Sequence, residues 1–152
     1  MVKTIVIFGS TTGNTEALAH SVAEGLKEGN IEPVVKNVTA AGVDELADYD
    51  LILLGSSTSS YGALQDDFVT FHNNLTGMHL KGKHAAVFGC GDQESYPDVF
   101  CAAVDILEEG LKQSSAKIVA ESLKIHAGMG SVVDEPAKEA AHAWALDIAK
   151  SV

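Results

Sequence analysis

Short apolar runs rich in β-branched residues recur along the chain, and each is too short to form a helix. Strands that are buried on both faces of a parallel sheet have this composition. Ile31 to Val38 is expected to be the second strand, with Ile31, Val35 and Val38 inward. The other runs are Val2 to Phe8, Leu51 to Leu54, Ala85 to Phe88, and Ile118 to Val119.

Segments with helical periodicity lie between these runs. The first of them ends at the stop signal Gly29-Asn30, and its apolar face consists of Leu18, Ala19, Val22, Ala23 and Leu26. Further helices are expected over Leu64 to Leu75, Asp98 to Leu111, and Pro136 to Ile148, the last of which places the single Trp, Trp144, in the core.

The alternation of five strands with helices predicts an α/β fold. Right-handed crossovers then give a doubly wound parallel sheet, most simply in the order 2-1-3-4-5, within three α/β/α layers. No linker or change in composition interrupts the chain, so residues 1–152 are expected to form a single domain.

A formal charge of −11 argues against nucleic acid as a partner and favours proteins with basic surfaces. The N-terminus has no basic region before its apolar stretch, and no apolar run approaches the ~18 residues of a membrane span, so a cytoplasmic protein is expected. Cys90 and Cys101 are expected to be reduced thiols in the core or beside a ligand. The histidines lack the spacing of zinc ligands, and no metal site is predicted.

In a sheet of this kind, ligands bind beyond the carboxyl ends of the strands. Those ends fall at Gly9 to Thr15, Gly55 to Gly62, and Gly89 to Phe100. The first of these segments contains Ser10, Thr11, Thr12, Gly13, Asn14 and Thr15 directly before a helix.

The start of a helix attracts an anion, the hydroxyl groups add donors, and Gly13 lets the backbone approach the ligand. Without a Gly-Lys-Ser/Thr sequence or the dinucleotide fingerprint, a monophosphate is the better prediction for this segment. The alternative is that the same residues only cap the helix.

The segment Ser10 to Thr15 after an apolar strand resembles the FMN-phosphate loop of flavodoxins. Two further segments resemble loops of that family. One is Gly55-Ser56-Ser57-Thr58 followed by Gln65-Asp66-Asp67-Phe68, and the other is Gly89-Cys90-Gly91-Asp92 followed by Tyr96 and Phe100-Cys101. The length resembles the short-chain branch, including the flavodoxins of sulfate-reducing bacteria.

The resemblance implies that FMN is bound without a covalent bond. Ser10 to Thr15 would hold its phosphate, with help from Ser57 and Thr58. Backbone groups of Cys90, Gly91, Asp92 and Cys101 would meet the pyrimidine edge, and Tyr96 would stack on the outer face of the ring. Phe100 belongs to the same segment.

Many flavodoxins have Trp where this chain has Ser59. Either a smaller group covers the inner face of the flavin, or the loop is shifted so that Tyr61-Gly62 takes the place of the aromatic-Gly pair. In the unshifted register, Ser60 stands where the family has a glycine whose backbone flips. If the flipped backbone requires a positive φ, a serine there costs on the order of 1 kcal/mol more than a glycine. A less stabilised semiquinone is therefore expected.

The implied function is that of a low-potential, monomeric one-electron carrier that passes through semiquinone and hydroquinone states and has no catalytic residues. Carboxylates beside the flavin loops, at Asp66, Asp67, Asp92, Glu94 and Asp98, would disfavour further negative charge on the cofactor. Two alternatives are an FMN-dependent quinone or flavin reductase on the same fold and a receiver-type signalling domain. The signalling domain would need acidic residues where Gly9-Ser10 and Gly55-Ser56 stand.

Overall fold

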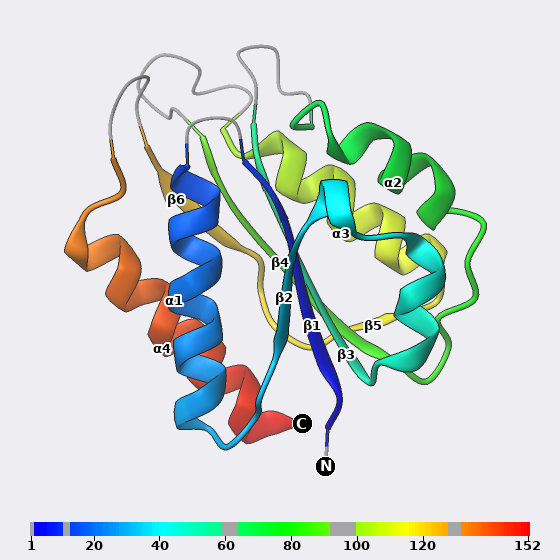
Figure 1. Ribbon diagram of the computed structural model, residues 1–152, viewed down its shortest axis with the longest axis horizontal. Helices are drawn as coiled ribbons and strands as arrows, with labels where there is room; N and C mark the ends of the chain where they lie inside the picture. The colour runs from blue at the N-terminus through cyan, green and yellow to red at the C-terminus, as the bar shows by residue number, and fades with distance from the viewer. Residues whose placement is uncertain (1, 11–12, 59–63, 92–99, 128–131) are drawn as a thin grey trace.

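The computed structural model describes residues 2–10, 13–58, 64–91, 100–127 and 132–152. A parallel sheet runs through the middle of the molecule, and helices cover both of its faces (Figure 1). Its longer strands are β1 (Thr4–Gly9), β3 (Leu51–Ser57) and β4 (His84–Gly91), with β2 (Val34–Asn37) beside β1. The order β2-β1-β3-β4-β5 confirms the predicted topology.

The last strand position of the sheet is divided into two pieces. β5 (Lys117–Ile118) pairs with the start of β4, and β6 (Leu123–His126) pairs with its end. The prediction of one strand ending at Val119 was wrong, because the intervening residues bond elsewhere. The carbonyl of Glu121 accepts from Trp144 Nε1 at 2.8 Å, and Ser122 Oγ donates to Glu108 at 2.7 Å.

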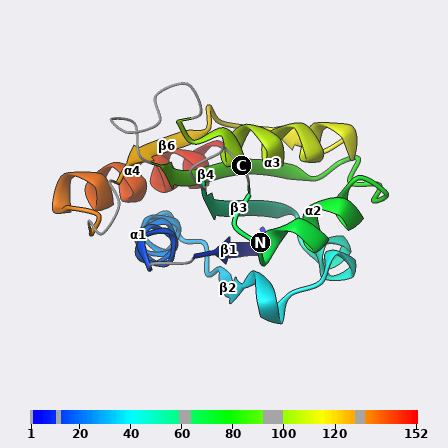
Figure 2. The same cartoon turned by 90° about the horizontal axis from the view of Figure 1, so that it is seen from above.

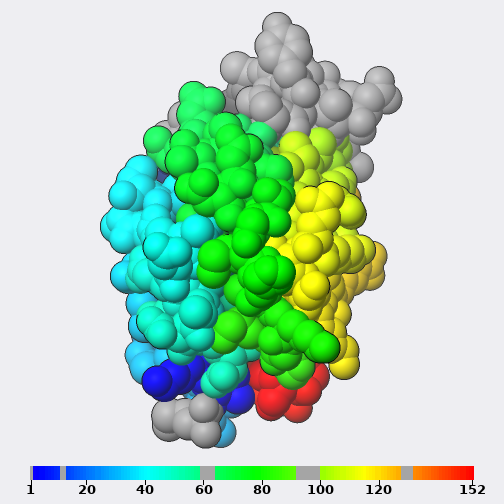
Figure 3. Space-filling view, turned by 90° about the vertical axis from the view of Figure 1, so that its right-hand side faces the viewer, coloured from blue at the N-terminus to red at the C-terminus, as the bar shows by residue number. Residues whose placement is uncertain are grey.

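Helices α1 (Asn14–Glu28) and α4 (Glu135–Ser151) cover one face of the sheet, and α2 (Phe68–Leu75) and α3 (Ala102–Gln113) cover the other (Figure 2). Two short 3₁₀ helices, η1 (Val38–Ala40) and η2 (Val43–Asp48), lie on the α2 side, as Figure 3 shows in cyan beside the green of α2. Within the described ranges, no helix is both long and apolar enough to cross a membrane.

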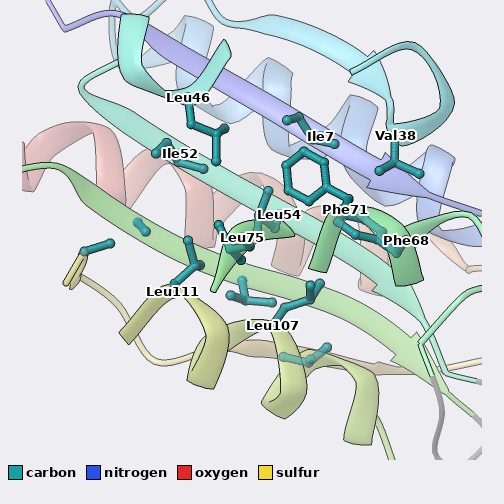
Figure 4. Close-up of a cluster of buried hydrophobic side chains, with 14 of the residues drawn as sticks. Ile7, Val38, Leu46, Ile52, Leu54, Phe68, Phe71, Leu75, Leu107 and Leu111 are labelled. Atoms are coloured by element: carbon teal, nitrogen blue, oxygen red, sulfur yellow. The ribbon is translucent and has the colours of Figure 1, made fainter. Parts of the chain in front are cut away.

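Alternate strand residues enter the two cores. Ile5 and Ile7 pack under α2 and α3, whereas Val6 and Phe8 pack under α1 and α4. The rings of Phe68 and Phe71 meet edge to face with centroids 5.5 Å apart, beside Ile7 and Val38 (Figure 4). Burial on both faces explains why the inner strands read as continuous apolar runs.

Two helices begin later than their apolar patterns predicted. Residue 64 forms a β-bridge with Thr58. The Gln65 side chain donates to the Asp67 carboxylate and accepts from the Asp67 N–H, so α2 begins only at Phe68. Cys101 has φ +52°, a left-handed conformation that a right-handed helix cannot contain, so α3 begins at Ala102. The predicted starts at Leu64 and Asp98 were therefore wrong.

The ends of α1 and β2 follow simple local rules. Helix α1 stops at Glu28, and Asn30 takes φ +68°, which confirms the stop signal. Ile31 and Val38 are buried as predicted, although β2 itself is confined to Val34–Asn37.

Helix α4 begins after Asp134, whose side chain accepts from the Ala137 N–H at 2.9 Å. On the inner face of this helix, Ala141, Ala145 and Ile148 are buried. Trp144 is half-buried rather than enclosed, because its indole N–H reaches out to the carbonyl of Glu121.

Helices α1 and α4 approach closely because Gly25 faces α4. A Cβ on Gly25 would lie 2.2 Å from the carbonyl oxygen of His142 and 2.9 Å from the Ala145 side chain. On the surface, His142 Nε2 lies 2.8 Å from a carboxylate oxygen of Glu28 and joins the same two helices. The α1/α4 packing thus fixes the position of the helix that begins at Asn14.

Candidate cofactor site

Strands β1, β3 and β4 all end at one edge of the sheet, here called the carboxyl edge (Figure 1). Three of the strand-end residues predicted to bind a ligand, Ser57, Cys90 and Gly91, lie there, and Ser57 pairs with Cys90. The sequence segments that follow these strands contain no Lys or Arg up to residue 80 after β3 or up to residue 111 after β4. An anion bound by these segments would therefore be held by dipoles and hydrogen bonds rather than by a Lys or Arg of the same segments.

The turn between β1 and α1 contains a glycine in the left-handed region of backbone conformation. Gly13 adopts φ +91° at the N-cap of α1, and its N–H donates to Ser10 Oγ at 3.0 Å. Apart from its chain neighbours, no residue that the structure describes places an atom within 4 Å of the point that a Gly13 Cβ would occupy. Thr11 and Thr12 lie outside the described residues.

The next two residues turn their side chains inward. Asn14 is 6% exposed, and its Oδ1 accepts from the N–H of Val133 at 3.0 Å. Thr15 is fully buried, and its Oγ1 lies 3.3 Å from Cys90 Sγ. Both side chains make structural contacts, so these residues would meet a ligand through their backbone N–H groups at the helix start.

The end of β3 is fastened to its surroundings by hydroxyl groups. The buried Ser56 Oγ accepts from the N–H of Gln65 at 3.2 Å and donates to the carbonyl of Ser57 at 2.8 Å. Thr58 donates its N–H to the carbonyl of Cys90 at 3.0 Å. Ser59, Ser60, Tyr61 and Gly62 lie outside the described residues.

The end of β4 packs against the start of α3. A Cβ on Gly91 would lie 3.0 Å from the backbone N of Cys101, so a larger residue here would require Cys101 to shift by a few tenths of an ångström. Phe100 is half-buried against the core under α2 and α3. Asp92 and Tyr96 lie outside the described residues.

Both cysteines are buried free thiols, as predicted. Burial raises the pKa of Cys90, with a smaller opposing effect from the Thr15 hydroxyl. Burial, and then the proximity of Cys90, raises the pKa of Cys101 to about 12. The Cys101 thiol points toward the carbonyl of Ile125, with Sγ 3.7 Å from that oxygen. Neither thiol has the lowered pKa of a nucleophile.

Several structural contacts at this edge were not predicted from the sequence. Val133 and Ala103 contribute backbone N–H groups, and Gln65 contributes a buried amide. The partners of Val133 and Ala103, which are Asn14 and Thr58, are distant in sequence, so no local pattern indicated these two contacts. For Gln65, the only signal was its position directly after the small-residue segment that follows β3.

The residues at the carboxyl edge fit a phosphate monoester. The donors are hydroxyl groups and backbone N–H groups at the positive end of the α1 dipole, and Gly13 leaves the approach open. The segment also lacks a competing carboxylate until Glu16, which is exposed. A neutral donor set of this kind suits a doubly charged phosphate group.

Comparison with known proteins gives consistent results. The family model described as Flavodoxin matches residues 6–144. A flavodoxin of Maridesulfovibrio salexigens is 39% identical over 155 aligned positions that cover 100% of both chains. The structure of oxidised flavodoxin 1 from Bacillus cereus matches with a TM-score of 0.90 at 34% identity, over 99% of each chain.

A Fusobacterium nucleatum flavodoxin mutant bound to flavin mononucleotide matches in fold, with a TM-score of 0.79 at 20% identity over 99% of this chain and 98% of that one. The family match, the full-length identity to a relative and the sheet order agree with one another. The chain belongs to the flavodoxin family.

Proposed function

We propose that this chain is a low-potential carrier that passes electrons one at a time between redox proteins. Its cofactor is FMN, held without a covalent bond. The observation that carries the proposal is the Gly13 turn at the start of α1, which faces the carboxyl edge in a chain of the flavodoxin family. Bound FMN supplies the redox chemistry, because a flavin accepts and releases single electrons.

The protein's part is to bind and orient the flavin. Backbone N–H groups at the start of α1, with the hydroxyls of Ser10 and Ser57, would hold the phosphate. Backbone groups of Gly91 and Cys101, which touch each other, would border the ring. The close packing of β4 on α3 fixes these groups before the ligand arrives, which lowers the entropy cost of binding.

Negative charge determines which redox states the protein favours. The chain has a formal charge of −11, and Asp66 and Asp67 are exposed just before α2. Each additional negative charge placed at the carboxyl edge is repelled by this field, so reduction to an anionic flavin requires a lower potential. The same field would attract basic surfaces on the electron donors and acceptors of a monomeric carrier.

The proposal is tested by stepwise anaerobic reduction of the FMN-loaded protein, followed by visible absorption. A carrier is expected to show a long-wavelength band of one-electron-reduced flavin that rises and then falls. Steady oxidation of NAD(P)H by the protein alone would instead indicate an FMN-dependent reductase. Failure of the full chain to bind FMN would overturn the proposal.

A further inference from the structure

Thr58 lies at a junction of three elements. It directly follows β3, and it forms an isolated bridge with residue 64 shortly before α2. Its N–H donates to the carbonyl of Cys90 near the end of β4. Its Oγ1 accepts from the N–H of Ala103, the second residue of α3, at 3.1 Å.

The hydrogen bond to Ala103 takes the place of a missing helix cap. The first N–H groups of any helix have no partner within the helix, and a side chain at the N-cap position normally accepts from the second or third of them. At the N-cap of α3 stands Cys101, whose side chain makes no such bond and whose thiol points toward Ile125. Thr58 supplies the acceptor from a position 45 residues earlier in the chain.

Cys101 needs this support because its backbone is in a rarely populated conformation. A non-glycine residue with φ +52° persists only where its surroundings hold it. Gly91 closes one side of Cys101, and the N–H of Ala103, two residues further on, is held by Thr58. The backbone conformation of Cys101 at the start of α3 therefore depends on the Thr58 hydroxyl.

We infer that Thr58 is a positioning residue, which caps α3 from β3 and fixes the Cys101 backbone for the flavin ring, rather than a ligand of the phosphate. The inference rests on the proposed function for its flavin, while the cap itself is a property of the protein alone. One side chain then joins the chain segments that follow β3 and β4. A change at either segment would reach the other through the Thr58 to Ala103 hydrogen bond.

The first test measures hydrogen exchange of the Ala103 amide in the full chain before FMN is added. Thr58→Val keeps the shape and removes the acceptor, so exchange at Ala103 should become about fivefold faster. Thr58→Ser keeps the acceptor and should restore slow exchange. Thr76→Val, at an exposed threonine whose hydroxyl donates to the carbonyl of Asn73, is the matched control and should leave exchange at Ala103 unchanged.

If Thr58→Val does not fold, as judged by circular dichroism, the pair Thr58→Ala and Thr58→Ser isolates the hydroxyl in the same way. Unchanged exchange at Ala103 in the variant that lacks the hydroxyl would overturn the inference. Because this measurement needs no flavin, its result does not depend on whether the protein carries electrons.

The second test titrates FMN and riboflavin, which lacks the phosphate, into the same variants. A positioning role predicts that loss of the hydroxyl weakens both ligands by the same factor, about tenfold, and changes the visible circular dichroism of bound FMN. Weaker binding of FMN with unchanged riboflavin would assign the hydroxyl to the phosphate and overturn the inference. Failure of the unaltered chain to bind either flavin would refute the proposed function but leave the exchange result standing.

Discussion

Asn14 Oδ1 accepts a hydrogen bond at 3.0 Å from the backbone N–H of Val133, 119 positions further along the chain. Both residues are buried, at 6% and 4% exposure. The bond fastens the segment before α4 to the first residue of α1, at the phosphate-binding turn proposed above. This bond adds to the contacts between the first and last helices themselves, at Gly25 and between Glu28 and His142.

Replacing Asn14 with Ala should lower the free energy of unfolding by about 1 to 3 kcal/mol, because the buried Val133 N–H loses its acceptor. Urea unfolding of the FMN-free chain measures the change. Asn73→Ala, at an exposed position on α2, is the control and should change stability by less than about 0.5 kcal/mol. Equal losses in the two variants would contradict the structural role of Asn14.

Gly13→Ala should cost about 1 kcal/mol of stability, because alanine is strained at φ +91° even though the space around it is open. Gly82 is a matched control, with φ +89°, open surroundings and a position far from the carboxyl edge. Both alanine variants should lose similar stability in thermal or urea unfolding. Only Gly13→Ala should weaken FMN binding, and equal FMN affinities would exclude Gly13 from the phosphate site.

Gly25→Ala should destabilise the protein by about 2 kcal/mol or more, because the added methyl group would overlap the carbonyl of His142 and force α1 and α4 apart. Gly42→Ala adds the same group at an exposed glycine with nothing within 4 Å. The free energy of unfolding of that variant should stay within about 0.5 kcal/mol of the value for the original chain. Chemical unfolding decides the comparison, and a neutral Gly25→Ala would show that the two helices can separate at little cost.

The raised pKa of Cys101 predicts how stability depends on alkaline pH. In the unfolded chain the thiol loses its proton near pH 8.5, whereas in the folded chain it keeps the proton to about pH 12. The unfolded state therefore binds fewer protons above pH 9, so the Cys101 contribution is complete below that pH and falls by up to about 1.4 kcal/mol per pH unit above it.

Cys101→Ala should remove the part of the pH dependence of the unfolding free energy that this thiol contributes. Unfolding free energies of the two proteins, measured from pH 7 to 10.5, should differ by a constant below about pH 8 and then converge. Parallel curves over the whole range would show that the thiol titrates equally in the folded and unfolded states.

The sequence predicts the parts of this molecule that local patterns control. Ile5 to Phe8 and Leu51 to Leu54 are apolar on both faces because the sheet is covered twice, and that pattern is visible without a structure. Right-handed crossovers with helices on both faces then leave 2-1-3-4-5 as the simplest order of strands. The position of the cofactor site follows in turn, because ligands of such sheets lie at the carboxyl ends.

Long-range polar contacts are the part that the sequence does not reveal. The sequence suggests that Thr58 helps to hold a phosphate, but not that its hydroxyl accepts from Ala103 or that the Asn14 side chain accepts from Val133. The predicted start of α2 was wrong for the same reason. Its apolar pattern continues back to residue 64, but a bridge to Thr58 replaces the helix there. Such choices depend on partners that only the folded chain brings together.

The divided strand at the side of the sheet also limits how much backbone the sheet exposes for pairing with another chain. β5 has 2 residues, β6 has 4, and β2 on the opposite side has 4, whereas the strands between them have 6 to 8. A long exposed strand offers unpaired amides to any neighbouring chain and invites aggregation. Because its outer strands are short, the chain without FMN should have little tendency to aggregate through its sheet edges.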